Sequence, residues 1–377
     1  VVVIVLNYII SKLIVFKNKN VYIYEKGVEL KMAKDKTNDM TVGNPVSLII
    51  RFMIPMCLGN IFQQFYSMVD TVIVGKFVGT KALAAVGSTG TIGFLILGFL
   101  MGLTAGFTVL TSQRFGAGDM PGMRKTVGSA AVLSVIVSVV MTVISMAFMK
   151  PLLILMNTPE DIFQDAYKYI MIICAGIFTQ VMYNLLAGIL RALGNSKTPL
   201  YFLLFSAGLN IVLDLVLIIV FHLGAAGAAY ATVIAQGVSA LLCLIYIIKK
   251  VPILKLDRWD FKLDGHLVRQ QLAIGFPMAL QYSITAIGAM MVQAALNVLG
   301  SVHVAAFTAA NKIEQVATQV YVALGTTMAT YCAQNMGAGK VKRISRGFRA
   351  TTIMGSIYSV VFGVLVFFFG NMLTGLF

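Results

Sequence analysis

Apolar stretches of helical length recur along nearly the whole chain after residue 45, and they restrict the fold more than any other feature. A helix needs about 20 apolar residues to cross the hydrocarbon core of a bilayer, and it satisfies its own backbone groups there. The sequence therefore predicts an all-α polytopic membrane protein. Nine transmembrane helices are expected, at residues 46–75, 83–112, 126–156, 166–190, 199–222, 225–248, 268–299, 304–333 and 347–372.

The composition excludes an ordinary soluble protein, because 59% of the residues are hydrophobic and only 11% are charged. A net charge of +15 would suggest a nucleic-acid partner for a soluble protein, but here the charge lies in short loops between spans. No nucleic-acid partner is expected. The four cysteines are scattered singly, without the spacing of metal ligands or of a disulfide framework.

The basic residues divide unevenly between the two sets of loops. The loops after the second, fourth, sixth and eighth spans hold sixteen Lys and Arg residues, whereas the other loops hold four, namely Lys76, Lys81, Lys150 and Lys168. Loops rich in Lys and Arg stay on the cytoplasmic side of a membrane. We therefore expect a multi-pass protein of a bacterial-type cytoplasmic (inner) membrane, with its amino terminus in the cytoplasm.

Residues 1–45 are predicted to form an amino-terminal tail. The apolar run at its beginning is short and is interrupted by Asn7, Ser11 and Lys12, so it does not read as a span. A polar stretch that resembles a natural start follows from Met32. Residues 1–31 are therefore either translated upstream sequence or a peripheral or additional helix.

The second half of the chain repeats the first. Three pairs of segments match: Ile54–Met56 with Phe276–Met278, Gly79–Gly87 with Gly300–Thr308, and Ser112–Met120 with Ala333–Val341. The offset is 222 residues for the first pair and 221 for the other two. Repeats in the same order, each with an even number of spans, are parallel repeats about an axis along the membrane normal, a common design of transporters.

This repeat divides the chain into predicted domains. Residues 46–248 form an amino-terminal lobe of six transmembrane helices, residues 249–267 a cytoplasmic linker, and residues 268–377 a partial second lobe of three helices. By the offset, Phe377 corresponds to Met156, the end of the third span. We expect the second lobe to be truncated at its carboxyl end, so that about 95 further residues would complete it.

Three of the fourteen acidic residues lie inside apolar spans, and they are Asp70, Asp214 and Glu314. A carboxylate there is costly unless it faces protein or a water-filled cavity, which makes each a candidate functional group. Asn210 precedes Asp214 by four residues, so the two share a face of the fifth helix. Gln63, Tyr66 and Asp70 follow the spacing i, i+3, i+7 and form a stripe on the first helix.

The motifs of the two halves together resemble the multidrug and toxic compound extrusion (MATE) family. Gln-x-x-Gly-Ala-Gly follows the second helix of each half, at Gln113–Gly118 and Gln334–Gly339, and a Pro opens each half. The segments Val69–Gly79 and Leu190–Pro199 strengthen the match, which covers Asn44 to Phe377. The resemblance implies two pseudo-symmetric six-helix bundles. It also implies a monomeric antiporter that exports organic cations and drugs in exchange for Na+ or H+.

In the branch of the family whose working site lies in the amino-terminal lobe, the resemblance assigns cation or proton binding to Asp70, Asn184, Asn210, Asp214 and Thr232. Carboxylate, amide and hydroxyl oxygens are hard ligands, so Na+ is expected at Asp70, Asn210, Asp214 and Thr232. A proton is the alternative, because burial and a neighbouring carboxylate both favour protonation. No cofactor other than this coupling ion is expected.

Other polar residues of the spans keep two interpretations. Gln63, Tyr66 and Glu314 are candidates for a secondary site or cavity, although Glu314 could equally pair structurally with residues beyond this chain. Pro55 either lets the first helix bend as Asp70 changes state, as the resemblance implies, or simply lies near the start of that helix. Thr285 stands where another branch of the family has an acidic residue.

The alternative function is a lipid-linked saccharide flippase of the same superfamily. The cavity of such a protein is expected to be lined by basic residues that bind pyrophosphate, whereas the charges inside these spans are mainly acidic. An enzyme is not expected, because no catalytic motif is found and the three His residues lie in or near loops without ligand spacing. A non-transporting membrane scaffold remains a third interpretation.

Overall fold

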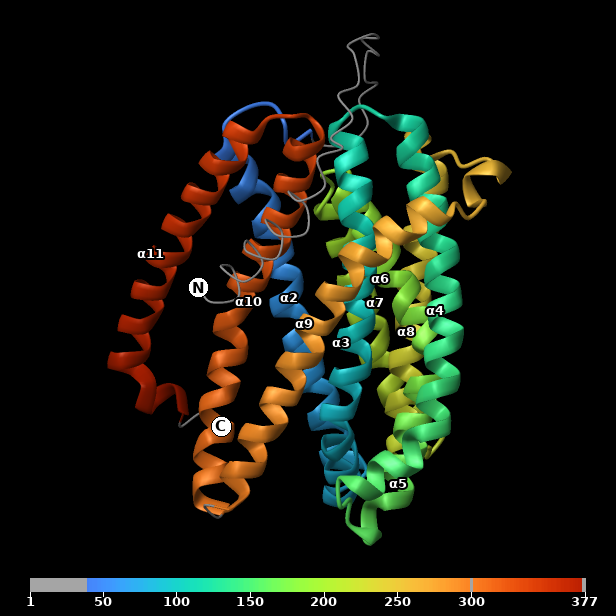
Figure 1. Ribbon diagram of the computed structural model, residues 1–377. Coiled ribbons are helices and arrows are strands. Elements are labelled where there is room, and N and C mark those ends of the chain that lie inside the picture. Colours follow the sequence, from blue (N-terminus) through green and yellow to red (C-terminus); the bar gives the residue numbers. More distant parts are fainter. Residues whose placement is uncertain (1–38, 299–300, 375–377) are drawn as a thin grey trace.

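The computed structural model describes residues 39–298 and 301–374, and every element in this part is helical (Figure 1). The predicted all-α class is therefore confirmed, whereas the question of residues 1–31 lies outside the described residues. The α-helices are α2 (Pro45–Phe77), α3 (Thr80–Gly116), α4 (Met120–Leu155), α5 (Glu160–Ala175), α6 (Ile177–Ala192), α7 (Lys197–Leu215), α8 (Ala225–Lys250), α9 (Gly265–Val298), α10 (Ser301–Gly337) and α11 (Val341–Thr374).

Seven helices of the described chain are long and apolar enough to cross a membrane, and they are α2, α3, α4, α7 with the turn that follows it, α8, α9 and α11. Together, α5 and α6 form an eighth candidate span. α10 has the necessary length, but Asn311, Glu314 and Gln315 interrupt its apolar sequence. Its predicted span at residues 304–333 therefore stays a prediction.

The predicted fourth helix is broken in two at Gly176, where α5 and α6 meet at an angle of 46°. A Cβ atom at Gly176 would lie 2.7 Å from Cγ1 of Val233 on α8, so α8 packs closely at this point because the residue is glycine. Sharp helix bends commonly occur at such small residues. Because the contact depends on a distant part of the chain, the apolar pattern alone predicted one straight helix.

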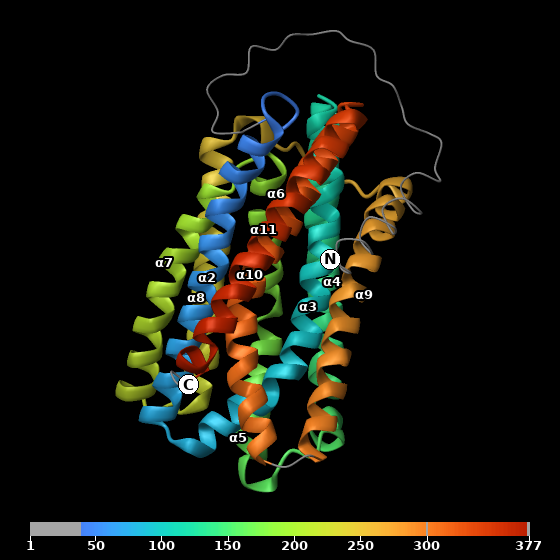
Figure 2. The ribbon, with the colours of Figure 1, turned by 90° about the vertical axis from the view of Figure 1, so that its left-hand side faces the viewer.

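α9 crosses α3 diagonally, and small residues allow the two backbones to approach closely (Figure 1). A Cβ atom on Gly102 would lie 2.7 Å from the backbone of Ala279, and Gly106 lies directly over Gly275. Small residues at helix crossings are typical of association in lipid, where packing rather than the hydrophobic effect joins helices. α10 packs against α2 and α3. α11 packs against α10 and α2; it is the outermost helix in Figure 1 and crosses in front of α10 in Figure 2.

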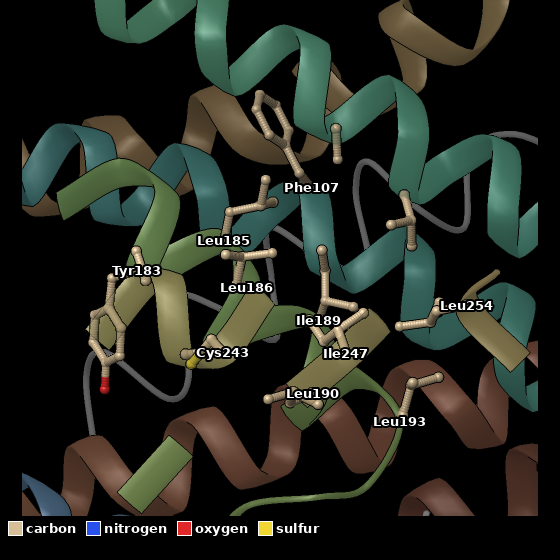
Figure 3. Packing of buried hydrophobic residues seen from close by; sticks show 14 of the residues in the cluster. Phe107, Tyr183, Leu185, Leu186, Ile189, Leu190, Leu193, Cys243, Ile247 and Leu254 are labelled. Carbon is tan, nitrogen blue, oxygen red and sulfur yellow. The ribbon is translucent and has the colours of Figure 1, made fainter. Parts of the chain in front are cut away.

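The largest buried cluster lies between α3, α4, α6 and α8 (Figure 3). Phe107 of α3, Leu185 and Leu190 of α6 and Cys243 of α8 are all at most 1% exposed. α6 is buried on every side from Leu185 to Leu190, as expected of a helix at the centre of a bundle. This packing fixes α8 against α6 and thereby fixes the polar residues that α8 contributes further along.

Candidate functional site

Asp70 and Asp214 come from two neighbouring helices and lie close together. Asp70 is on α2 and Asp214 is on the last turn of α7, two helices in mutual contact. The two carboxyl groups act on each other electrostatically. Asp214 is completely buried and Asp70 is half-buried. Two acids that are far apart in the sequence thus belong to one site.

Two tyrosines complete the surroundings of this acid pair. Tyr66 of α2 and Tyr169 of α5 both lie within electrostatic reach of Asp70 and Asp214. The Tyr66 hydroxyl also interacts with the side-chain amides of Gln63 and Gln236. The predicted stripe of Gln63, Tyr66 and Asp70 is therefore a polar face of α2 that is turned towards α7 and α8.

Several polar atoms of the site are buried without a hydrogen-bond partner in the part of the chain that the structure describes. They are both carboxylate oxygens of Asp214, Oδ1 and Nδ2 of Asn210, Oδ1 of Asp70 and Oε1 of Gln236. Buried polar atoms are nearly always paired, and an unpaired one costs about 1 to 3 kcal/mol. A concentration of such oxygens inside a membrane helix bundle is typical of an ion or proton site.

A small cavity lies between α2, α7 and α8. Its lining includes Tyr66 and Asn210, each four residues before an acid of the pair, but neither Asp70 nor Asp214. Its volume is about 10 Å³, close to the minimum that one water molecule needs. The Ser206 hydroxyl donates to the Ala235 carbonyl at 2.7 Å, so its oxygen can serve an occupant only as an acceptor. The other polar groups of the lining are those of Tyr66, Asn210, Thr232 and Gln236.

The chain leaves α-helical geometry immediately after Asp214. Residues Val216–Val220 form a π-helical turn, which α8 meets at Gly227, and a Cβ atom there would lie 3.1 Å from Ile218. Single π turns inside helices are frequent at functional sites because they shift the register of the residues beside them. The sequence predicted an uninterrupted helix over 199–222, since the segment is apolar and has no local signal of a π turn.

Two predicted site residues, Asn184 and Glu314, contribute neither to the unpaired buried atoms nor to the cavity lining in the described chain. The Asn184 side-chain amide donates to the Gln180 carbonyl of its own helix at 2.9 Å. Glu314 is exposed on α10, and no ion pair forms at its carboxylate within the described residues. Their proposed roles in transport stay predictions.

Pro55 lies in the interior of α2, which begins at Pro45, and is buried there. Capping by Asn44 starts α2 about three turns before Pro55, since the Asn44 side chain accepts from the Val46 N–H at 2.9 Å. The alternative that Pro55 simply lies near the start of the helix stays open. An interior proline leaves the carbonyl four residues before it without an intrahelical partner. The bend that the resemblance implies stays a prediction.

Sequence reasoning missed two members of the site, Tyr169 and Gln236. Gln236 follows Thr232 by four residues and so lies on the same face of α8, which was a usable signal. Tyr169 gives no comparable signal, because only the folding of α5 against the rest of the bundle brings it to Asp70 and Asp214. Both are neutral, so a search for charges inside spans passes over them.

Comparison with known proteins identifies a family model and several relatives that match this chain. The MatE family model matches residues 55–216 and 273–377. The probable multidrug resistance protein YpnP of Bacillus subtilis is 33% identical over 346 residues, which cover 91% of this chain and 76% of that protein. The probable multidrug resistance protein YoeA of the same organism is 29% identical over 333 residues, or 86% of this chain and 72% of that protein.

The fold agrees as well. A solved outward-facing multidrug resistance MATE transporter of the MOP superfamily superposes with a TM-score of 0.83 at 25% identity, over 90% of this chain and 75% of that chain. Because a family model, its relatives and the fold all match and the helices have spanning length, the chain belongs to the MATE family.

Proposed function

We propose that this protein exports organic cations and related drugs by exchanging them for Na+ or H+, with the coupling ion at the Asp70–Asp214 pair. The observation that carries the proposal is the set of buried, unpaired oxygens on Asp214, Asn210 and Asp70. Drug export is supported by relatives named as multidrug resistance proteins. The flippase alternative is not favoured, since its pyrophosphate would meet the Asp70–Asp214 pair rather than basic groups at this site.

The coupling ion is proposed to bind to Asp70, Asn210, Asp214 and Thr232. Two ionised carboxylates in a low-dielectric interior repel each other, and one bound cation or proton relieves the repulsion. Neutral oxygens from Asn210 and Thr232 suit Na+, which takes hard oxygen ligands. A cationic drug is attracted to the same negative charge, so loading the ion weakens the binding of the drug and exchange follows. Asn184 is assigned a supporting role on α6.

The proposed setting is a bacterial-type cytoplasmic membrane, in which the protein acts as a monomer with its amino terminus in the cytoplasm. The excess of basic residues at one end of the bundle supports this orientation. Residues 46–248 are proposed as one lobe that contains the whole ion site, and residues 268–377 as part of a second. The site is therefore proposed to belong to the branch of the family with the working cation in the amino-terminal lobe.

Ethidium efflux from a drug-sensitive bacterium tests the proposal. Cells that express the protein should retain less ethidium than cells with an empty vector, and Asp214→Asn should remove the difference. Asp165→Asn is the matched control, because Asp165 is an exposed acid on α5 outside the acid pair. Omission of Na+ at constant pH distinguishes the two coupling ions. Efflux that survives Asp214→Asn and Asp70→Asn together would show that the coupling site lies elsewhere.

A further inference from the structure

The connection between α8 and α9 is fixed against α4 rather than loose. It contains two 3-10 turns, Pro252–Leu254 and Arg258–Phe261. The Arg124 guanidinium donates to the Ile253 carbonyl at 3.0 Å. A Cβ atom on Gly128 of α4 would lie 2.6 Å from the carbonyl carbon of Asp260, so the second turn rests directly on the α4 backbone. The side chains of this turn therefore point in defined directions.

The second turn presents aromatic and basic side chains outward. In a 3-10 helix, residues three apart lie on the same face. Asp260 is buried and caps the turn, where its Oδ2 accepts from the Asp257 N–H at 2.9 Å, whereas Asp257 itself is exposed. The remaining two faces pair Arg258 with Phe261 and Trp259 with Lys262. Trp259, the only tryptophan of the chain, is 77% exposed, and Phe261 is 42% exposed.

Basic side chains outnumber acidic ones on the exposed surface around this connection. Lys255, Arg258 and Lys262 are exposed, and none of them forms an ion pair among the described residues. Lys249, Lys250 and Arg269, on the helix ends that the connection joins, are exposed as well. The exposed acids are Asp257 and Asp264, and Asp264 Oδ1 accepts from the His266 N–H at 2.8 Å. Six exposed cations and two exposed acids thus lie within ten residues of Trp259.

The connection lies at the depth of lipid headgroups. In Figure 1 it projects sideways from the upper end of the bundle, beside α4 and below the turn between α3 and α4. α4 has 36 residues, which gives a length of about 54 Å, and the hydrocarbon core accounts for about 30 Å of it. If both ends project equally, the hydrocarbon boundary falls about 12 Å from each end, which corresponds to about eight residues. Gly128, on which the turn rests, is eight residues into α4.

We infer that the turn around Trp259 is a binding surface for anionic phospholipid, on which the aromatic rings enter the headgroup layer and Lys255, Arg258 and Lys262 contact phosphate groups. Tryptophan is enriched at this level because its ring is apolar and its N–H is polar. Basic residues next to a membrane are attracted to anionic lipids at short range. The connection is then an anchor that holds α4 and the start of α9 at a fixed depth in the membrane.

Because Trp259 is the only tryptophan, its fluorescence reports on this surface alone. The full chain is reconstituted in vesicles with equal parts of phosphatidylglycerol and phosphatidylcholine, and only one of the two lipids carries bromine near the headgroup. Bromine quenches a nearby indole. We expect quenching in both preparations, and stronger quenching when phosphatidylglycerol carries the bromine. Aqueous iodide should quench weakly.

The triple variant Lys255→Gln, Arg258→Gln, Lys262→Gln should be quenched equally by the two brominated lipids. The matched control Lys76→Gln, Lys81→Gln, Lys150→Gln removes three exposed cations outside the connection and should keep the preference. Strong quenching by iodide and none by bromine would overturn the inference. So would burial of Trp259 that occurs only at a high protein-to-lipid ratio, since a second protein copy would then cover it. A preference that persists in the triple variant would overturn the role of the three cations.

Discussion

Gly116 and Gly337 hold the two copies of the Gln-x-x-Gly-Ala-Gly motif against each other in a reciprocal contact. A Cβ atom on Gly116 would collide with the backbone of Gln334, and one on Gly337 would collide with the backbone of Gln113. Such a reciprocal contact is typical of two surfaces related by a two-fold axis. Here the Gly of each copy of the motif contacts the Gln of the other copy. The motif that is repeated in the sequence is thus a junction between its own two copies.

Substitution of either junction glycine, Gly116 or Gly337, by alanine should destabilise the contact between the two motif copies. The neighbour is main chain rather than a flexible side chain, so the two turns must move apart. The expected loss is about 1 to 3 kcal/mol in the free energy of unfolding, the usual cost of overpacking. The thermal unfolding midpoint of the purified protein measures it.

Gly87→Ala on the same helix α3 is the matched control, because nothing lies within 4 Å of its Cβ position. It should leave the unfolding midpoint unchanged or raise it, since alanine favours a helix over glycine. Equal midpoints for Gly116→Ala, Gly337→Ala and Gly87→Ala would contradict the importance of the junction. The double variant should lose less than the sum of the single variants, because both act on one contact.

Arg343, in the first turn of α11, attaches the segment before α2 to that helix. Its guanidinium donates to the Gly43 carbonyl at 2.9 Å and to the Met40 carbonyl at 3.3 Å. Hydrogen bonds from a charged group are worth about 1.5 to 3 kcal/mol, and the planar fork of Arg makes several at once. Arg343→Gln should therefore raise amide hydrogen exchange at the start of α2, with Arg346→Gln as the exposed control. Unchanged exchange in Arg343→Gln would argue against the attachment.

Sequence periodicity was sufficient for the elements of this fold but not for their irregularities. The spans can be predicted from runs of apolar residues, because a helix needs about 20 of them to cross the hydrocarbon core. The break at Gly176 depends on its contact with Val233, and the position of the α8–α9 connection depends on the contact between Gly128 and Asp260. Both contacts join segments that are distant in the sequence. A contact of that kind leaves no periodic pattern in either segment.

Gln236 is expected to contribute to ion binding, although sequence reasoning did not include it. Its Oε1 is buried without a partner in the described chain and borders the same cavity as Asn210 and Thr232. Gln236→Leu keeps the approximate volume and removes this oxygen. We expect about a tenfold rise in the Na+ or H+ concentration that gives half-maximal efflux, which corresponds to about 1.4 kcal/mol.

Leu203→Met is the control for this experiment, because Leu203 lines the same cavity but carries no oxygen that could bind an ion. It should lower stability slightly and leave the ion dependence unchanged. If both variants shift the ion dependence equally, a general change in packing is responsible and Gln236 is not a ligand.

The acid pair itself was within reach of sequence reasoning, because a carboxylate in an apolar span is conspicuous whatever it contacts. The spacing of Asn210 and Asp214 also placed both on one helix face. The residues around the pair were harder to predict from the sequence. Tyr169 is neutral and comes directly after the charged residues of α5, so only the packing of α5 reveals its place beside the acid pair.

Protons should compete with Na+ at the acid pair, which gives a pH dependence with a definite sign. Na+ binds the ionised carboxylates, and each bound proton removes a negative ligand, so the apparent affinity for Na+ falls as the pH falls. One proton displaced per ion corresponds to about a tenfold change in affinity per pH unit. The Na+ concentration that gives half of the maximal shift in the thermal unfolding midpoint, taken at several pH values, measures this effect. Asp214→Asn should abolish the shift at every pH, whereas Asp165→Asn should preserve it. An affinity for Na+ that stays constant across pH would mean that the ion binds away from Asp70 and Asp214.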